Sequence, residues 1–392
     1  MQKYYKHPDT KKIITLEVGG IKDLDKWRKL GFVEATPQER LAYITKVEQS
    51  DRENNDLEAD QAKRDGLVNI YYMAPHKNDD GYGQSCRNIK DLIKEHGIYL
   101  DPIYRGQEVG LCYHLPNTLQ LVKTPIKISF TMFETNQYPK FWEPYLKSAD
   151  HVIVPTQFCA DIMEANFGIR PDVCPLGYFP KAFSYIERQK RDVFTFLHYD
   201  AFKWRKGWDI LFRAFNEEFG EQLTEGDPDV RLIFKTTLGI TPPLHEYPKI
   251  KVIKGRIPQE DFTELMATSD CFVFPTRGEG FGLTPLEAMA TGMRTIVPNH
   301  SGITHYWDKR YCIGLDYYPT RAKYDNLELR GLDLGDYWEP TTESLKKAMR
   351  KAYNEWKAGT FYDNCKEIAE YAKQFTIQDT AKNLSAILKR FV

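Results

Sequence analysis

The sequence predicts an α/β protein with doubly wound, largely parallel sheets. From Leu67 onward, short β-rich apolar segments alternate with helical segments, which is the pattern of consecutive βαβ units. Several of these segments are apolar on successive residues rather than alternately, as expected for strands buried on both faces of a sheet. At roughly 150 residues per domain, the 392 residues suggest two or three domains.

The expected elements follow one another along the chain. The segments expected as strands are 67–73, 126–132, 151–154, 193–197, 230–234, 250–253, 271–274 and 295–297. The segments expected as helices between them are 88–96, 157–166, 208–219 and 259–269. Phe179-Pro180-Lys181 and the charged run 187–192 indicate a crossing between two such domains.

Residues 1–65 differ from the rest of the chain. Residues 3–16 have the pattern of a short hairpin with its turn at 8–10. Thr36 and Glu39, with Pro37 between them, form a predicted capping box. The charged stretch that follows, up to about Asp65, is either a solvated helix or a loose linker. We expect a small accessory module or linker of unknown use.

Composition and charge exclude several classes of protein. With 42% hydrophobic and 28% charged residues, the chain is neither disordered nor collagen-like. Its formal net charge of -1 does not favour nucleic acid or anionic membranes, so such contacts would need a local patch. The seven cysteines form no C-x-x-C pair and are expected to be reduced and buried. The chain shows no signal-peptide core and no apolar run of roughly 20 residues, so we expect a cytoplasmic protein without a membrane span.

The strongest local motif follows the strand predicted at 271–274. A turn with glycines at 278, 280 and 282 should let the backbone approach a ligand closely. A helix comes next, with Thr284 expected as its N-cap, Pro285 at its first position and Gly292 just beyond its end. The free N–H groups at the start of such a helix suit a phosphate group.

Two carboxylates accompany this motif. Beside an anion site, Glu279 and Glu287 are better acceptors for ribose or sugar hydroxyls than ligands for phosphate. Glu287 has an equally simple structural reading, as the third helical residue of a capping box. Glu279 has no comparable structural reason, because a glycine-flanked loop needs no carboxylate.

Other patterns are less specific. Arg205 and Lys206 follow a predicted strand and could neutralise a diphosphate leaving group, although a solvated basic turn explains them as well. Gly81 and Gly83 begin an incomplete dinucleotide fingerprint, in which Cys86 replaces the third glycine, and they suit a loop facing a cleft. No His/Cys spacing indicates a metal, and two Asp-x-Asp matches are expected by chance.

From about Leu67 to the C-terminus, the chain resembles retaining glycosyltransferases with the GT-B fold, family four. The resemblance is carried by the two-glutamate segment 278–292, the phosphate-binding segment 205–211, and segments 132–135 with Trp142, 150–158 and 173–177. It implies two Rossmann-like domains that face a cleft. We expect an accessory module at 1–65, an acceptor domain at 66–183, a nucleotide-sugar domain at 184–377, and a helix at 378–392 that crosses back to the first domain.

The resemblance also implies roles for particular residues. Glu279 would contact the transferred sugar and Glu287 the ribose. The diphosphate would be held by Lys206 with Arg205 or Lys203. Further donor-site residues would be Gly83, Gly280, Phe281, Gly282, Leu283 and Thr284, and His114 would be the active-site histidine of the first domain. Two positions depart from the family pattern: Ala201 stands where many members have Arg, and His305 where many have Glu.

The implied activity is metal-independent transfer of a sugar, with retention, from a nucleoside-diphosphate sugar to an acceptor hydroxyl. A UDP-sugar is favoured over a GDP-sugar, and no cofactor is expected. The acceptor would be a glycan or small molecule, or alternatively a hydroxylated base in phage DNA, since the first residues loosely resemble N-terminal modules of phage proteins. A phage-encoded chain would act in the host cytoplasm. A non-catalytic nucleotide-sugar-binding protein and a dinucleotide-dependent oxidoreductase remain alternatives, and the sequence does not indicate the oligomeric state.

Overall fold

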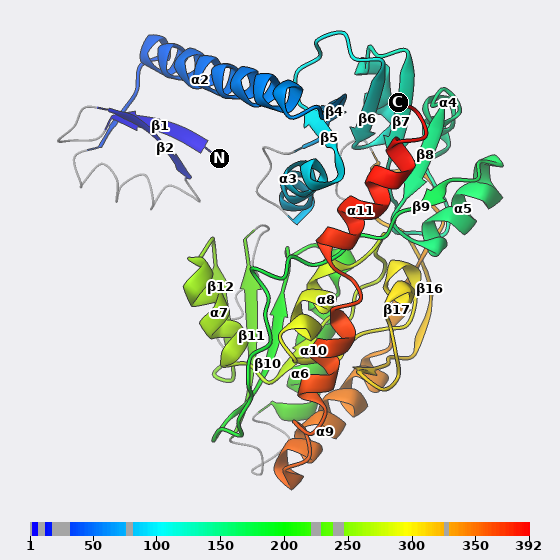
Figure 1. The fold of residues 1–392 in the computed structure, drawn as a ribbon. Helices are drawn as coiled ribbons and strands as arrows, with labels where there is room; N and C mark the ends of the chain where they lie inside the picture. Colours follow the sequence, from blue (N-terminus) through cyan, green and yellow to red (C-terminus); the bar gives the residue numbers. More distant parts are fainter. Residues whose placement is uncertain are drawn as a thin grey trace. The chain divides into compact units, whose positions relative to one another are not determined.

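The computed structural model describes residues 2–6, 12–17, 32–75, 81–220, 229–237, 247–324 and 329–392. The chain divides into two compact units, Met1–Asn69 and Ile70–Val392, which are described separately below (Figure 1). No helix among the described residues is long and apolar enough to cross a membrane.

The first unit contains a small antiparallel sheet and one long helix. Strands β1 (Gln2–Lys6), β2 (Ile13–Glu17) and β3 (Val33–Glu34) lie in the order β2-β1-β3. The pairing of β1 with β2 confirms the predicted hairpin, whose turn at 8–10 lies outside the described residues. The Thr36–Glu39 capping box is present at the start of α2 (Pro37–Arg64). The charged stretch is therefore a helix rather than a loose linker.

The second unit contains two six-stranded sheets. The first sheet has the order β5-β4-β6-β7-β8-β9, and the second has the order β12-β11-β10-β13-β14-β15. The strands of the first are β4 (Val68–Met73), β5 (Ile98–Asp101), β6 (Val109–Tyr113), β7 (Ile126–Phe130), β8 (His151–Val154) and β9 (Asp172–Val173). Strand β4 begins two residues before the boundary between the units. The strands of the second sheet are β10 (Phe194–Tyr199), β11 (Val230–Thr236), β12 (Ile250–Lys254), β13 (Cys271–Val273), β14 (Arg294–Ile296) and β15 (Cys312–Ile313).

Every described strand pair in these two sheets is parallel, and the strands are largely buried. This confirms the predicted doubly wound α/β class with two Rossmann-like halves. The strand order reverses between β4 and β6 in the first sheet and between β10 and β13 in the second. Ligands of such sheets bind beyond the carboxyl ends of the strands at these reversal points.

The helices agree in part with the expected ones. Helices α5 (Gln157–Phe167), α6 (Trp208–Phe219) and α7 (Gln259–Ala267) lie where the sequence predicts them. The helix expected at 88–96 instead begins at Gly81, as α3 (Gly81–Leu92) with a 3-10 turn at Ile93–His96. Tyr82, Cys86 and Ile89 explain the difference, because their i, i+4, i+7 spacing packs one face onto the core.

A hairpin in the second half was not predicted from the sequence. Strands β16 (Tyr317–Arg321) and β17 (Asp336–Pro340) pair antiparallel outside the main sheet. Leu329 and Leu334, in the segment between these strands, are buried in a cluster with Phe133 and Tyr138 of the first half. The hairpin segment therefore bridges the two halves of the second unit.

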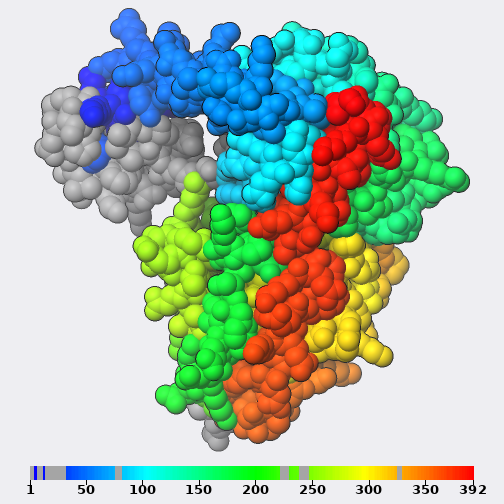
Figure 2. Space-filling model, viewed as in Figure 1, coloured from blue at the N-terminus to red at the C-terminus, as the bar shows by residue number. Residues whose placement is uncertain are grey.

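The remaining helices are α4 (Glu143–Lys147), α8 (Leu283–Ala290), α9 (Thr342–Ala358), α10 (Cys365–Ala372) and α11 (Ile377–Leu388). Helix α9 packs against α6, and α10 packs against α8. Helix α11 leaves the second half and packs against α3 of the first, where Figure 2 shows its red surface beside the cyan one. Its buried residues Ile377, Leu384 and Leu388 belong to a core cluster that includes residues of the first sheet.

Candidate active site

The predicted cations lie in the turn after β10. The 3-10 turn Trp204–Lys206 ends at Gly207, whose φ of 73° is left-handed. A Cβ at Gly207 would lie 1.9 Å from the carbonyl oxygen of Pro275. Only glycine therefore lets this turn lie against the loop that follows β13. The backbone N–H of Arg277 donates to the Arg205 carbonyl at 2.7 Å and joins the two segments at the reversal point of the second sheet.

Glu279 lies between the two predicted cations. Its Oε1 is 2.8 Å from Arg205 Nη1 and 2.9 Å from Lys206 Nζ. Thr276 Oγ1 donates to the same oxygen at 2.9 Å, and the N–H of Glu279 donates to Ser301 Oγ at 3.0 Å. The residue is 6% exposed. Burial alone would raise the pKa of Glu279, but the charges of Arg205 and Lys206 outweigh it and lower the pKa to about 2. The carboxylate is therefore ionised at neutral pH.

Each cation has a second carboxylate partner. Lys206 Nζ lies 2.9 Å from Asp200 Oδ2. Arg205 Nη2 lies 3.2 Å from Glu134 Oε1, which the first half supplies after β7. The hydroxyl of Tyr324, from the bridging segment, donates to Glu134 Oε2 at 2.8 Å. No local pattern in the sequence predicts a role for Glu134, although it lies in one of the segments that carry the family resemblance.

Two glycines of the motif serve contact between the halves. A Cβ at Gly278 would lie 2.2 Å from the Glu134 carbonyl oxygen, and one at Gly280 would lie 2.8 Å from Met132. Thr156 Oγ1 of the first half donates to the Gly280 carbonyl at 3.1 Å. The close approach predicted for a ligand is thus, at these two positions, an approach of protein to protein.

Helix α8 begins earlier than predicted. Its N-cap is Gly282, with φ 86°, and not Thr284, whose hydroxyl is buried without a hydrogen-bond partner. The left-handed glycine takes the place of a side-chain cap because the chain turns sharply into the helix there. Within the described part of the chain, no hydrogen bond is found for four backbone amides at this start: Phe281, Gly282, Leu283 and Thr284. Gly292, with φ 80°, lies just beyond the helix end as predicted.

Glu287 is not part of a capping box, which corrects its structural reading. Its carboxylate accepts a hydrogen bond from the Tyr199 hydroxyl at 3.1 Å. Burial raises the pKa of Glu287 to about 7; the Tyr199 hydrogen bond opposes this shift and the nearby Asp200 charge adds to it. The two glutamates of the motif therefore differ, because Glu279 has two cations beside it and Glu287 has none.

The other predicted site residues are more scattered. Gly83 lies in the first turn of α3 rather than in a loop, which corrects that expectation. His114 follows β6, and its Nδ1 accepts the Leu115 N–H at 2.8 Å. Lys203 is exposed at the start of the 204–206 turn. His305 lies 5.7 Å from Phe281 between ring centroids, and burial lowers its pKa.

Sequence reasoning missed Arg277. This residue is 1% exposed and forms ion pairs with Asp209 and with Glu339. Its guanidinium carbon lies 3.9 Å from the ring centroid of Trp204. The available signal was a basic residue in the loop that follows the buried strand β13, where an unpaired charge would be costly.

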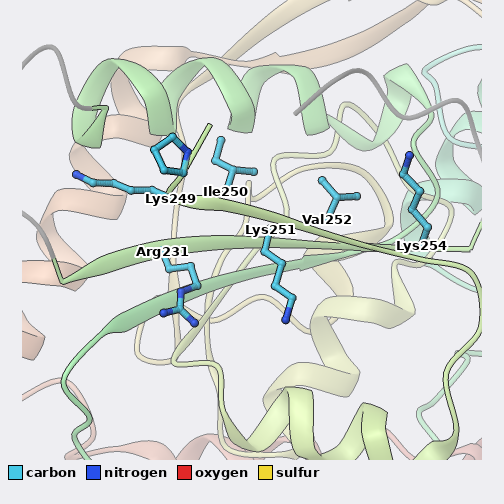
Figure 3. Close-up of a pocket in the computed structure, with 7 residues that line it drawn as sticks. Arg231, Lys249, Ile250, Lys251, Val252 and Lys254 are labelled. Carbon is cyan, nitrogen blue, oxygen red and sulfur yellow. The ribbon is translucent and has the colours of Figure 1, made fainter. Parts of the chain in front are cut away.

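A separate cavity of about 650 Å³ lies at the edge of the second sheet, away from these residues (Figure 3). Arg231 and Lys251 extend to one side of the strands, and Ile250 and Val252 to the other. Its full lining is Arg231, Pro248, Lys249, Ile250, Lys251, Val252 and Lys254. Cations on an edge strand such as β12 prevent pairing with another sheet, which explains them without a ligand.

Comparison with known proteins agrees with this geometry. Residues 248–319, which include both Glu279 and Glu287, match the family described as "Glycosyl transferases group 1". This match lies within the second half of the second unit. The GT-B solved structures that it resembles include a glycosyltransferase from Rickettsia africae ESF-5, with a TM-score of 0.61, 11% identity and coverage of 83% of this chain and 98% of that one. The second unit has the GT-B fold.

Two further comparisons extend this finding. The Anabaena protein HepE, solved with UDP and glucose, has a TM-score of 0.56 and 12% identity, and the match covers 82% of this chain and 99% of HepE. Mannosylfructose-phosphate synthase from Agrobacterium fabrum is 27% identical over 183 residues, 40% of this chain. The match spans only 39% of that relative's length. The likeness to solved structures therefore establishes the GT-B fold.

Proposed function

We propose that this chain transfers a sugar from a nucleoside-diphosphate sugar to an acceptor hydroxyl, with retention of anomeric configuration and without a metal. The observation that carries the proposal is the position of Glu279. Its ionised carboxylate contacts Arg205 and Lys206, and its Cγ lies 3.4 Å from where a Cβ of Gly282 would be, at the start of α8. Sugar hydroxyls could donate to the carboxylate while the helix amides and cations hold the phosphates.

The two glutamates would contact different parts of the donor. Glu279 would accept from hydroxyls of the transferred sugar, and Glu287, beside Tyr199, from hydroxyls of the ribose. Lys206, with Arg205 or Lys203, would hold the diphosphate; Arg205 and Lys206 each have two carboxylate partners in the structure. Lys203 is exposed and can add a further charge. Gly83 and His114 follow β4 and β6, the strands at the reversal point of the first sheet, where Gly83 would lie near the donor and His114 would be the active-site histidine of the first half.

The transfer itself needs one bond to form and one to break. The acceptor oxygen attacks the anomeric carbon from the face on which the nucleoside diphosphate departs. The bond from the anomeric carbon to the phosphate oxygen breaks, and its electron pair leaves with the diphosphate. The departing phosphate oxygen takes the proton of the acceptor hydroxyl, so no separate base is required. Lys206 and the N-terminus of α8 stabilise the developing negative charge.

The decisive experiment is a screen of UDP-, GDP- and ADP-sugars for hydrolysis or transfer by the purified protein. We expect turnover with a UDP-sugar, undiminished by EDTA, and an NMR spectrum that shows a product of the same anomeric configuration as the donor. Turnover that EDTA abolishes would contradict metal independence, and the opposite anomer would contradict retention. Binding without turnover would instead favour a non-catalytic nucleotide-sugar-binding protein, and binding of NAD would favour the oxidoreductase alternative.

The acceptor class is a separate part of the proposal. A glycan or small-molecule acceptor is favoured because the overall charge of -1 gives no general attraction to nucleic acid. The alternative, a hydroxylated base in phage DNA, requires duplex binding that weakens steeply as salt is added. Absence of duplex binding at low salt would exclude it. The cytoplasmic location stays a prediction from the sequence.

A further inference from the structure

We propose that Arg277 is a positioning residue of the reaction centre, which holds the 204–206 turn in place and thereby aligns Arg205 and Lys206 with Glu279. The expected effects on kinetics rest on the proposed function. The expected effects on structure rest only on the geometry of Arg277. The partners of the Arg277 guanidinium are Asp209, Glu339 and the Trp204 carbonyl, none of which is assigned to the donor. Arg277 would act only through the segments that carry the donor-site residues.

The guanidinium of Arg277 is the point where three segments meet. Its Nη1 and Nη2 each donate to Asp209, in the first turn of α6, at 2.8 Å. Its Nη2 donates to Glu339 on β17 at 2.9 Å, and its Nε donates to the other oxygen of the same carboxylate. The Nη1 also donates to the Trp204 carbonyl. A planar guanidinium can make all these bonds at once, whereas a lysine ammonium cannot.

The surroundings of Arg277 restrict the turn further. The guanidinium stacks on the Trp204 ring at 3.9 Å, and the Arg277 N–H donates to the Arg205 carbonyl at 2.7 Å. The turn is therefore tied to Arg277 on both sides of the Arg205 side chain. On its other face, the Arg277 carbonyl accepts the Trp338 N–H at 2.9 Å. The same residue thus ties the turn to β17.

The link to β17 extends the effect to the first half. The hairpin segment carries Tyr324, which stacks on Phe133 with ring centroids 5.4 Å apart and donates to Glu134. Glu134 is the first half's partner of Arg205. Arg277 therefore connects the turn that carries the cations to the β16–β17 hairpin segment, which also bridges the two halves. The placement of Arg205 and Lys206 depends on that hairpin segment. Loss of the hydrogen bonds made by the Arg277 guanidinium should displace Arg205 and Lys206 without removing either charge.

The test compares Arg277→Lys with Arg294→Lys. Arg294 is a matched control because it also pairs with a glutamate, Glu355, and lies over an aromatic ring, Phe361, but contacts no candidate site residue. For R277K we expect a fall in kcat of about 10- to 100-fold with a smaller change in the donor KM, since misplacement by about 1 Å can cost about 100-fold. R294K should keep the wild-type kcat.

Two readouts separate positioning from a general loss of stability. The acid limb of the kcat/KM profile should move to higher pH in R277K only, because Glu279 then loses the nearby cations that keep it ionised. Hydrogen exchange should rise in the 203–209 peptide of R277K and stay unchanged there in R294K. The exchange measurement needs no turnover, so an inactive wild-type protein would contradict the proposed function while leaving this inference testable.

Equal kcat, equal pH profile and equal exchange in R277K and wild type would overturn the proposal. If R277K does not fold, Glu339→Gln replaces it, since this change weakens one of the two carboxylate contacts and keeps Arg277 itself. For E339Q we expect smaller changes of the same kind in kcat, in the acid limb and in hydrogen exchange of the 203–209 peptide. A variant that loses stability but keeps kcat and the acid limb would also overturn the positioning role.

Discussion

The carboxylate of Glu279 and the ammonium of Lys206 are in direct contact, with Oε1 and Nζ 2.9 Å apart. Both side chains are largely buried, at 8% and 13% exposure. A buried ion pair of this kind has a high desolvation cost, so it is weak evidence for a purely stabilising role. The pair lies at the reversal point of the second sheet, where the proposed function places the donor.

Glu279→Gln should lower kcat by about 100-fold or more, because an amide keeps the size of the side chain but cannot offset the cations or accept as strongly from sugar hydroxyls. Steady-state kinetics with the best donor gives the measurement. Glu355→Gln, which alters an ion pair elsewhere, is the control and should keep wild-type turnover. A fully active E279Q protein would exclude the proposed role of the carboxylate.

Lys206→Ala should weaken binding of a nucleoside diphosphate and make that binding less sensitive to salt, because one cation facing the phosphates is removed. Calorimetric titration of UDP at low and high salt compares wild type with the variant. Lys346→Ala, which removes a surface lysine paired with Glu343 on α9, should leave both affinities unchanged. Equal salt dependence in K206A and wild type would count against diphosphate contact.

Glu287→Gln should change the pH dependence of stability. The pKa of Glu287 is about 7 in the folded chain against its usual 4.5, so the unfolded chain loses this proton first as pH rises. The free energy of unfolding therefore falls between about pH 4.5 and 7, by up to about 3 kcal/mol. Urea denaturation at pH 5 and pH 8 should show this fall in wild type and a smaller one in E287Q. An equal change in unfolding free energy between pH 5 and pH 8 in wild type and E287Q would show that Glu287 is ionised in the folded protein.

Donor binding should release a proton near neutral pH. Ribose hydroxyls that donate to Glu287 favour its ionised form and lower its pKa, so a proton leaves when the donor enters at pH 6.5. Calorimetry in buffers of different ionisation enthalpy measures this release directly. E287Q should bind without it. Proton uptake in wild type would contradict hydroxyl donation to this carboxylate.

Gly278→Ala should disrupt the contact between the halves, because its Cβ would lie 2.2 Å from the Glu134 carbonyl and 2.9 Å from the Tyr337 ring. We expect a loss of about 1–3 kcal/mol in unfolding free energy and reduced turnover. Gly314→Ala is the control: its added Cβ would meet the Trp307 ring at 3.2 Å and no backbone atom. Thermal unfolding and kinetics of both variants provide the comparison.

Local sequence signals predict much of the fold. Helix α6 agrees with its predicted range because a left-handed glycine precedes it and its apolar residues repeat at helical spacing. Strand β6 was missed because it contains Gly110, which usually weakens a strand. The glycine is required there, since a Cβ would lie 2.5 Å from Thr124 Oγ1. The glycine is required because two separate segments pack closely at this point. Such packing leaves no local pattern in the sequence.

The same division applies to the site. Glu279, Glu287 and the Arg205–Lys206 pair could be found because each lies in a short motif after a strand. Glu134 pairs with Arg205, and Arg277 pairs with Glu339, so each has a partner far away in the sequence. Their roles depend on how a first-half loop and the β16–β17 hairpin pack together. No spacing within either segment predicts that packing.

The contact of α11 with α3 has a consequence during synthesis of the chain. The first sheet is translated long before residues 377–388, which cover one of its helices. While the second half is being made, α3 lacks that covering, so its apolar surface stays available to chaperones on the ribosome. We therefore expect the first half alone, as residues 70–180, to aggregate when expressed, and a separately supplied α11 peptide to improve its solubility.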